Sequence, residues 1–309
     1  MKTQVIVNPE ADHGRTGKKW IQIKAALRAF LKEFKCEFTE KPLQATEISR
    51  AAIKEGSELI VGIGGDGTVN EIANGFYENQ QIINPKTILG IVPSGRGSDF
   101  SRSLNIGPGL KNALRVIKEG LPAHIDIGRV RYKNHSGEDE DRFFLNISDF
   151  GLGGEVVRRM NKDRAERKTS SYFKSTVSAF FGYKGKKVRI RIDGHDICVE
   201  NCLIGAVANG RVFGKGMKIA PLASLDDGLF DMVLIQGMKI WEFCRNILRV
   251  YAGNHLSHPK VAHLRGKRIE ITPENTDEDV LIEVDGEQLG KLPANFDIQS
   301  GRLLIKGNI

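Results

Sequence analysis

The chain has 309 residues, of which 40% are hydrophobic and 27% are charged, and its formal net charge is +8. This length favours two domains over one, and because there is no run of about 18 apolar residues, no transmembrane helix is expected. The four cysteines form no C-x-x-C pair, so reduced thiols in a cytoplasmic protein are expected. The positive charge suits an anionic partner such as a nucleotide, a nucleic acid or a membrane surface.

The first 120 residues alternate apolar strands with amphipathic helices. The first strand begins almost at the N-terminus, so no apolar segment of a signal peptide is expected. Such alternation predicts a parallel sheet with helices on both faces. Strands are predicted at residues 3–7, 36–39, 59–63 and 87–92, and helices at about 18–34, 45–55, 68–77 and 110–119.

A glycine-rich loop follows the strand at 59–63, and a helix is predicted to begin at about Thr68. Glycines let a ligand approach the backbone, and a helix N-terminus favours a phosphate. Residues 62–67 also match the dinucleotide fingerprint G-x-G-x-x-G, but the carboxylate of Asp66 would repel a bare pyrophosphate. A divalent cation between them would remove that repulsion. A glycine-rich turn without any ligand is the structural alternative.

Polar, glycine-bearing loops follow the strands that end at Val7, Ile63 and Val92. Ligands of parallel sheets bind outside the carboxyl ends of the strands. These loops are therefore expected to converge on one site.

After about Leu121 strands predominate, and helices are predicted only at about 155–164, 171–182 and 239–251. This pattern indicates an antiparallel β-sandwich or a barrel-like domain. We therefore expect an α/β domain at 1–122 and a second, antiparallel β-sandwich domain at 123–309.

Residues 64–71, Gly-Gly-Asp-Gly-Thr-Val-Asn-Glu, resemble the G-G-D-G-T-x-N-E signature of the diacylglycerol kinase catalytic domain family, shared by bacterial lipid kinases, sphingosine kinases and ceramide kinases. Further ordered blocks resemble segments of that family across nearly the whole chain. They are Asn8-Pro9 with Gly14-Arg15, residues 91–100, Ala208-Asn209-Gly210, residues 220–231 and residues 283–287.

The resemblance implies an N-terminal α/β domain with a parallel sheet like that of NAD kinases and phosphofructokinases, and a C-terminal β-sandwich. It also implies ATP- and Mg²⁺-dependent phosphorylation of a lipid hydroxyl, with diacylglycerol as the first-choice acceptor. The expected protein is cytoplasmic and contacts the membrane surface peripherally; homodimer formation is left open and no nucleic acid partner is expected.

Phosphoryl transfer requires a positioned nucleotide and neutralised charge. The candidate nucleotide-binding residues are Asn8, Gly14, Arg15, Thr39, Gly64, Gly65, Asp66, Gly67, Thr68, Asn70, Ser94, Gly95 and Arg96. Asp66 is expected to engage Mg²⁺ or its water shell. Helix capping is the alternative for Thr68 and Asn70, a solvated surface role for Arg15 and Arg96, and a helix-start or loop role for Thr39.

The resemblance assigns the general base to Glu287, although Asp285-Gly286 before it also has the signature of a hairpin turn. It places a second, structural Mg²⁺ at Asp227, with backbone carbonyls of Ser224 and Leu229; a tight turn alone would also explain that string. Asp126 and Asp99 are further candidates for carboxylates around the catalytic metal.

Two positions depart from the family pattern, because Arg96 stands where threonine is usual and Ser98 where asparagine is usual. An arginine could replace the threonine hydroxyl by a bidentate contact with phosphate. Two other functions stay open. One is a kinase of a soluble acceptor, like an NAD kinase, which shares the G-G-D-G core; the other is a non-catalytic nucleotide-binding regulator, which lost activity at Arg96 and Ser98 would favour.

Residues 158–191 carry twelve Lys or Arg and two Asp or Glu, with Tyr172, Phe173, Phe180, Phe181 and Tyr183 among them. Such a segment could dock on an anionic membrane. The alternatives are a solvated helix pair with core aromatics and, without any supporting motif, RNA binding.

Overall fold

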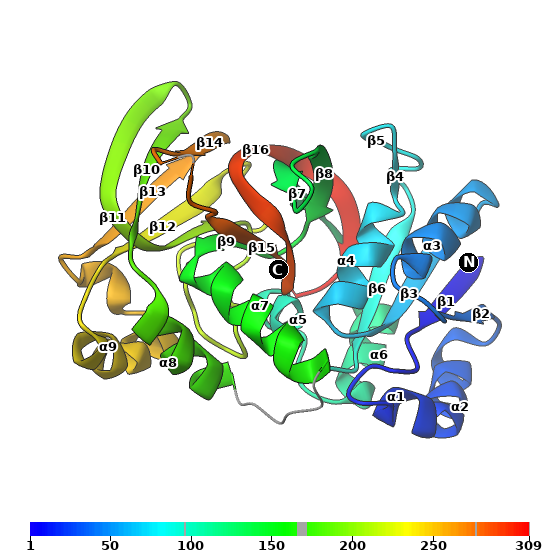
Figure 1. Ribbon diagram of the computed structural model, residues 1–309. Helices are drawn as coiled ribbons and strands as arrows, with labels where there is room; N and C mark the ends of the chain where they lie inside the picture. Colours follow the sequence, from blue (N-terminus) through cyan, green and yellow to red (C-terminus); the bar gives the residue numbers. More distant parts are fainter. Residues whose placement is uncertain (96, 166–171, 276, 309) are drawn as a thin grey trace. The chain divides into compact units, whose positions relative to one another are not determined.

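The computed structural model describes residues 1–95, 97–165, 172–275 and 277–308 (Figure 1). The chain divides into two compact units. Unit 1 contains Met1–Ile127, Leu225–Asp227 and Gln299–Ile309, and unit 2 contains Gly128–Ser224 and Gly228–Ile298. In the described ranges no helix is both long and apolar enough to span a bilayer.

Unit 1 is built on strands that pair side by side in the order β2-β1-β3-β6, with the end of β16 next to β6. These pairs are parallel. The strands are β1 Thr3–Val7, β2 Lys35–Phe38, β3 Leu59–Gly64 and β6 Ile88–Pro93. The last strand, β16 Glu287–Lys306, begins in unit 2 and ends in unit 1. A short hairpin is formed by β4 Tyr77–Glu78 and β5 Gln81–Ile82. The helices are α1 Arg15–Lys18, α2 Trp20–Leu31, α3 Gln44–Lys54, α4 Asp66–Asn74, α5 Asp99–Ser103 and α6 Leu110–Glu119.

The central strands of unit 1 are apolar because helices cover them. Every residue of β1 and β3 is buried, as expected for strands of a sheet covered on both faces. A Cβ on Gly62 would lie 2.6 Å from Cδ1 of Ile72 in α4. Glycine at this position therefore lets α4 pack directly on β3.

Unit 2 is mainly antiparallel, with neighbours in the order β13-β12-β11-β10-β14-β16 and β9 between β11 and β15. Its strands are β7 Pro122–Asn134, which starts in unit 1, β8 Asp139–Phe144, β9 Ile147–Gly151, β10 Lys186–Ile192, β11 His195–Ala208, β12 Phe230–Gln236, β13 Val261–Gly266, β14 Arg268–Pro273 and β15 Leu281–Val284. Its helices are α7 Leu152–Ala165, α8 Tyr172–Gly182, α9 Ile240–Ala252 and the 3₁₀ helix η1 His255–Ser257.

Unit 2 has two groups of buried apolar side chains. One lies among the strands and includes Phe144, whose ring contacts the rings of Phe230 and Phe296. The other includes Phe243 of α9, with Phe180 of α8 packed against it. The ring centroids of Phe180 and Phe243 are 5.0 Å apart, so α8 and α9 are neighbours (Figure 1).

Three expectations from the sequence need correction. The parallel pairs expected for the N-terminal strands are present, but in the described residues they belong to the same sheet as the antiparallel pairs of β16, so this sheet is mixed. The second half is not one continuous domain, because the last residues return to unit 1 and pair with β6. The helix predicted at 18–34 is divided at Lys19 between α1 and α2. Pattern analysis places elements along the chain but does not show which distant strand completes a sheet.

Candidate functional site

The loops after the strands of unit 1 are joined by backbone hydrogen bonds. The amide of Asn8 donates to the carbonyl of Ile63 at 3.0 Å, and the amide of Ser94 donates to Gly64 at 2.8 Å. The amide of Thr39 donates to Val7 at 2.9 Å. The expected convergence of loops at the carboxyl ends of the strands is therefore present within unit 1.

Two glycine-rich loops meet backbone to backbone. A Cβ on Gly95 would lie only 2.9 Å from Cα of Gly65, closer than real Cβ contacts. A Cβ on Gly64 would lie 2.6 Å from both Cβ and Oγ1 of Thr68. Close packing therefore requires glycine at positions 64 and 95. Gly67 lies in the first turn of α4, directly before Thr68.

Replacing Gly95 by alanine will separate the two loops, because the added methyl group meets backbone atoms that cannot rotate away. We expect the free energy of unfolding to fall by about 1–3 kcal/mol, as measured by urea titration. The matched control is Gly65→Ala, whose Cβ would lie 3.9 Å from Gly95 in ordinary contact. Equal responses of the two variants would contradict the backbone contact.

Asp66 links the two loops from the first turn of α4. Its Oδ2 accepts a hydrogen bond from the amide of Asp99 at 2.9 Å, and its Oδ1 accepts one from Phe100 at 3.3 Å. A carboxylate at the N-terminus of a helix satisfies free amides there, so Asp66 caps α5. The sequence indicated a metal-binding role for Asp66 but not this cap.

Thr68 and Asn8 form a side-chain contact between the loops, in which Nδ2 of Asn8 donates to Oγ1 of Thr68 at 2.9 Å. Asn70 is buried, and its Oδ1 accepts a hydrogen bond from Asn74 at 3.1 Å one turn later in α4. Both hydrogen bonds join parts of the protein to each other and therefore have a structural role. Both side chains thus help to fix the loop and helix at which the sequence predicts a nucleotide.

The loop after β1 contributes Gly14 and Arg15. Gly14 has φ +76°, a left-handed conformation that suits glycine, and it precedes α1. The guanidinium of Arg15 is largely exposed and lies 3.4 Å from Oδ2 of Asp12. Ser94 contacts the hydroxyl of Thr16. Arg96 lies outside the described residues.

The structural Mg²⁺ was predicted at Asp227 with the carbonyls of Ser224 and Leu229, and Asp126 was predicted near the catalytic metal. Asp126 and Asp227 belong to unit 1, whereas Ser224 and Leu229 belong to unit 2. Asp126 is buried; its amide donates to the carbonyl of Leu225, and its Oδ1 accepts from the amide of Gly301, both at 2.6 Å. Within the described ranges no group of three or more His, Cys, Asp or Glu side chains is arranged to hold a metal ion.

In unit 2, Glu287 begins β16 directly after a two-residue hairpin turn. Val284 and Glu287 are paired across this turn, and Asp285 and Gly286 have φ of +48° and +92°, which is the geometry of a type I′ hairpin. Oε2 of Glu287 lies 3.0 Å from the guanidinium of Arg142. The hairpin turn indicated by the sequence is thus present, and the ion pair holds the Glu287 side chain.

Asp285 has a structural role that the sequence did not indicate. Its buried carboxylate accepts hydrogen bonds from the consecutive amides of Leu145, Asn146 and Ile147 at 2.8, 3.0 and 3.0 Å. Nδ2 of Asn209 donates to the carbonyl of Leu145 at 2.7 Å. Two blocks identified in the sequence, Asn209-Gly210 and Asp285-Gly286-Glu287, therefore meet at residues 145–147.

A pair of buried carboxyl groups lies beside this turn, and no sequence motif indicated it. Asp149 of β9 and Glu283 of β15 are directly opposite each other in antiparallel strands. Burial is the main cause that raises the pKa of both groups, and it raises that of Asp149 to about 6. Both Asp149 oxygens are buried, and hydrogen bonding with the Glu283 carboxyl and the Gly154 amide lowers the pKa of Asp149 by less than burial raises it. The two carboxyls can bond to each other only if one is protonated.

Oε1 of Glu283 also accepts a hydrogen bond from the amide of Gly286 at 2.5 Å. The carboxyl pair is therefore connected to the turn that carries Asp285 and Glu287. The signal that could have found it is the acidic residue in each of two otherwise apolar strands, but only strand pairing places these residues opposite each other.

The basic segment at 158–191 is largely neutralised where its side chains are described. Arg158 and Arg159 both pair with Glu155, and Lys186 and Lys187 pair with Glu278 and Glu200. The basic composition of the segment therefore does not by itself produce a free cationic surface. Residues 166–171 lie outside the described part of the chain.

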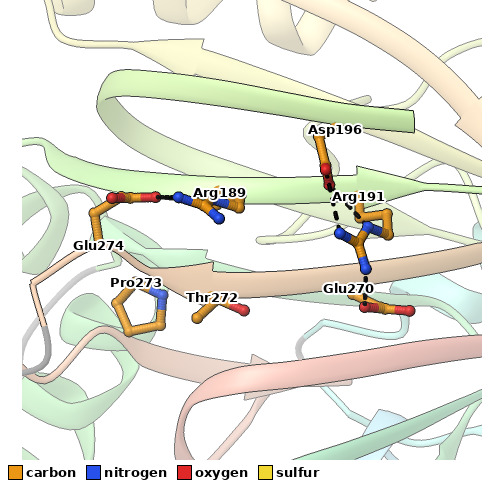
Figure 2. A pocket seen from close by; sticks show the side chains of 7 residues that line it. All are labelled: Arg189, Arg191, Asp196, Glu270, Thr272, Pro273 and Glu274. Atoms are coloured by element: carbon orange, nitrogen blue, oxygen red, sulfur yellow. Dashed lines mark hydrogen bonds and ion pairs between the residues drawn. The ribbon is translucent and has the colours of Figure 1, made fainter. Parts of the chain in front are cut away.

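A cavity of about 390 Å³ lies over β10 and β14. Figure 2 shows Arg189 directed toward Glu274, and Arg191 between Asp196 and Glu270. Each arginine has an acidic partner, and exposed ion pairs of this kind contribute little to stability. The balanced charges do not favour a phosphate in this cavity.

Comparisons with known proteins agree with the two-part organisation. Residues 2–130 match the model of the diacylglycerol kinase catalytic domain, and residues 147–306 match that of the YegS C-terminal NAD kinase beta sandwich-like domain. A diacylglycerol kinase from Staphylococcus carnosus (strain TM300) is 32% identical over 269 residues, which cover 84% of this chain and 79% of that protein.

Solved structures are similar over almost the full length. A crystal structure from Bacillus anthracis (strain Sterne), provisionally assigned as a diacylglycerol kinase, has a TM-score of 0.78 at 25% identity and covers 99% of this chain and 95% of its own. Yeast NADH kinase in complex with NADH has a TM-score of 0.54 at 14% identity, covers 99% of this chain and 82% of its own, and shows likeness of fold alone.

These findings support the NAD kinase-like fold with a sandwich-like second domain, and they confirm the family resemblance noted in the G-G-D-G block. The chain belongs to the diacylglycerol kinase catalytic domain family of phosphotransferases.

Proposed function

We propose that this protein is a lipid kinase that transfers the γ-phosphate of ATP to a lipid hydroxyl, with diacylglycerol as the acceptor and phosphatidic acid as the product. The observation that carries the proposal is the 32% identity with a diacylglycerol kinase over 84% of the chain. The joined loops of unit 1 support it, because the close packing of Gly64 on Thr68 and of Gly95 on Gly65 brings two glycine-rich loops together at the N-terminus of α4.

In this proposal the amides of residues 64–68 and of the loop at 94–97 bind the phosphates of ATP, because free amides at a helix N-terminus favour anions. Asn8, Gly14, Thr39, Thr68 and Asn70 shape the surrounding loops. Arg15 and Arg96 supply positive charge to the phosphate oxygens.

The proposed Mg²⁺ neutralises phosphate charge when it is bound. Asp66 fits such an ion, because carboxylate oxygens are ligands that Mg²⁺ takes in proteins, and the amides of Asp99 and Phe100 orient its carboxylate. For the structural site we propose Asp227 with the carbonyls of Ser224 and Leu229. Asp126 is proposed as a further carboxylate around the catalytic metal. Buried Asp126 already accepts one backbone amide, which orients its carboxylate.

Glu287 is the proposed general base for the acceptor hydroxyl. Its ion pair with Arg142 fixes one carboxylate oxygen and leaves the other to accept a proton. The protein is proposed to be cytoplasmic and to meet its acceptor at the membrane surface.

A kinase of a soluble acceptor is the second candidate. The similarity to yeast NADH kinase favours it only at the level of fold. A panel of acceptors that contains diacylglycerol, sphingosine, ceramide and NAD, with labelled ATP as donor, separates the two candidates. Transfer to NAD alone would replace the lipid proposal, and ATP binding without transfer to any acceptor would favour a regulatory protein.

Replacing Asp66 by asparagine will reduce phosphate transfer at least about 100-fold, because it removes the charge proposed to engage the cation and weakens the cap of α5. Initial rates with labelled ATP and diacylglycerol vesicles measure the effect. The control is Glu119→Gln, an exposed charge change at the end of α6 in the same unit. Transfer by Asp66→Asn within tenfold of the unmodified protein would contradict the role of Asp66.

A further inference from the structure

The apolar residues of helix α9 extend beyond the side that packs on the core and reach the exposed surface, which is unusual for a helix at the surface of a protein in water. Phe243 is buried, and Ile240, Ile247 and Val250 pack against the same core. On the outer side Trp241 is 58% exposed and Leu248 is 73% exposed. At 3.6 residues per turn, positions 241, 245, 248 and 251 fall within an arc of about 120°.

We call the exposed residues Trp241, Arg245, Leu248 and Tyr251 the α9 face. The exposed large apolar side chains in the described part of unit 2 are gathered on or near it. They are Phe181, Leu222, Trp241, Leu248 and Tyr251. Phe181 belongs to the neighbouring helix α8 (Figure 1).

The loop that carries Leu222 runs beside the C-terminal end of α9. The amide of Lys218 donates to the carbonyl of Val250 at 3.1 Å, and a Cβ on Gly253 would lie 3.2 Å from Cβ of Pro221. Exposed apolar residues that gather in this way mark an interaction surface.

The charge around the α9 face is positive. Residues 209–222 and 237–252 together contain six Lys or Arg and one acidic residue, Glu242, and Glu242 pairs with Lys260. Arg245 lies over the ring of Trp241, 5.7 Å from its centroid. Aromatic rings beside arginine and lysine are typical of residues at the boundary between hydrocarbon and lipid headgroups.

We propose that the α9 face is the surface by which this protein docks on an anionic lipid bilayer, with Trp241 and Leu248 entering the headgroup region and the surrounding basic residues contacting acidic headgroups. A second copy of the chain fits less well, because the basic surface would face itself. The inference deepens the proposed function, since it rests on a lipid acceptor held in a bilayer. It moves the docking surface away from the ion-paired segment at 158–191.

The protein has two tryptophans, Trp20 and Trp241, so Trp20→Phe leaves Trp241 as the single fluorescent reporter. With vesicles of phosphatidylcholine and phosphatidylglycerol, we expect the Trp241 emission to shift to shorter wavelength as the ring leaves water. With phosphatidylcholine alone, or in high salt, we expect a smaller shift. An unchanged emission at vesicle concentrations that bind the protein would overturn the proposal.

Co-sedimentation with the same vesicles tests the surface directly. The double variant Trp241→Ala/Leu248→Ala should bind at least tenfold more weakly, with an unchanged urea midpoint because both side chains are exposed. The matched control is Ile21→Ala, which removes an apolar side chain that is 83% exposed on α2 of unit 1 and should bind normally. A change of less than twofold in the double variant would refute the proposal.

Two further outcomes separate the alternatives. Sedimentation equilibrium that shows a dimer dissociated by the double variant would assign the α9 face to a second copy and overturn the membrane proposal. Phosphate transfer to a short-chain, water-soluble diacylglycerol should be equal in the double variant and the unmodified protein. If neither protein transfers phosphate while vesicle binding still depends on Trp241 and Leu248, the proposed function fails and the docking surface stands.

Discussion

Replacing Asp285 by alanine will lower the free energy of unfolding by about 4 kcal/mol, because three buried amides lose their acceptor and each unsatisfied donor costs about 1–3 kcal/mol before water partly replaces it. Those amides belong to Leu145, Asn146 and Ile147. The loss is a large part of the stability of an ordinary domain. Urea unfolding, followed by far-ultraviolet circular dichroism, measures it.

Matched substitutions at Asp285 separate the carboxylate from the backbone. Asp285 has φ +48°, which costs alanine about 1 kcal/mol or more but costs glycine nothing. Asparagine tolerates this conformation and keeps one acceptor oxygen. The expected order of stability is therefore aspartate, asparagine, glycine, alanine. An alanine variant as stable as the unmodified protein would show that the three hydrogen bonds contribute nothing.

Replacing Asp149 by asparagine will stabilise the protein at pH 8 relative to the unmodified chain. Burial raises the pKa of Asp149 to about 6, whereas an unfolded chain has a pKa near about 3.9. The folded protein thus keeps a proton that the unfolded chain releases. Stability is lost as pH rises through this window, by about 3 kcal/mol between pH 4 and pH 6. The raised pKa of Glu283 extends the loss to higher pH.

The asparagine amide can donate to the Glu283 carboxylate without an added proton, so the variant should lack most of that pH dependence and gain about 2 kcal/mol at pH 8. Urea unfolding of both proteins from pH 4 to pH 8 gives the difference between their free energies of unfolding. The contributions of the other carboxyl groups cancel in this difference. Glu283→Gln should also lose most of the pH dependence. The control Asp139→Asn, an exposed change at the β8 hairpin, should keep it. Parallel pH profiles would refute the shared proton.

Local residue patterns predicted much of unit 1. The apolar runs at Leu59 and Ile88 became the buried strands β3 and β6, and the glycine loops after them are joined by hydrogen bonds as expected. This succeeded because a strand followed by glycines and a helix start is a local signal. The strand β13 and the short helix α5 were not predicted, because their residues carry no comparable periodicity.

Contacts between distant segments could not be predicted in the same way. The acidic residue at Asp66 indicated phosphate chemistry, but its two hydrogen bonds to α5 depend on the packing of loops about thirty residues apart. The basic segment at 158–191 suggested a docking surface, yet Glu278 from the loop before β15 and Glu200 from β11 pair with two of its lysines. Exposure of Trp241 and Leu248 also depends on which side of α9 meets the core.

The sequence by itself determined the family of this protein, its glycine-rich loops and the order of most of its strands, since these follow from residues close together in the chain. Only the tertiary structure decided that the last strand returns to β6, that Asp285 holds residues 145–147, and that Asp149 faces Glu283. The physical reason is that strand pairing and burial join residues more than a hundred positions apart. Those long-range contacts, and no local pattern, determine which carboxylate is paired, protonated or exposed.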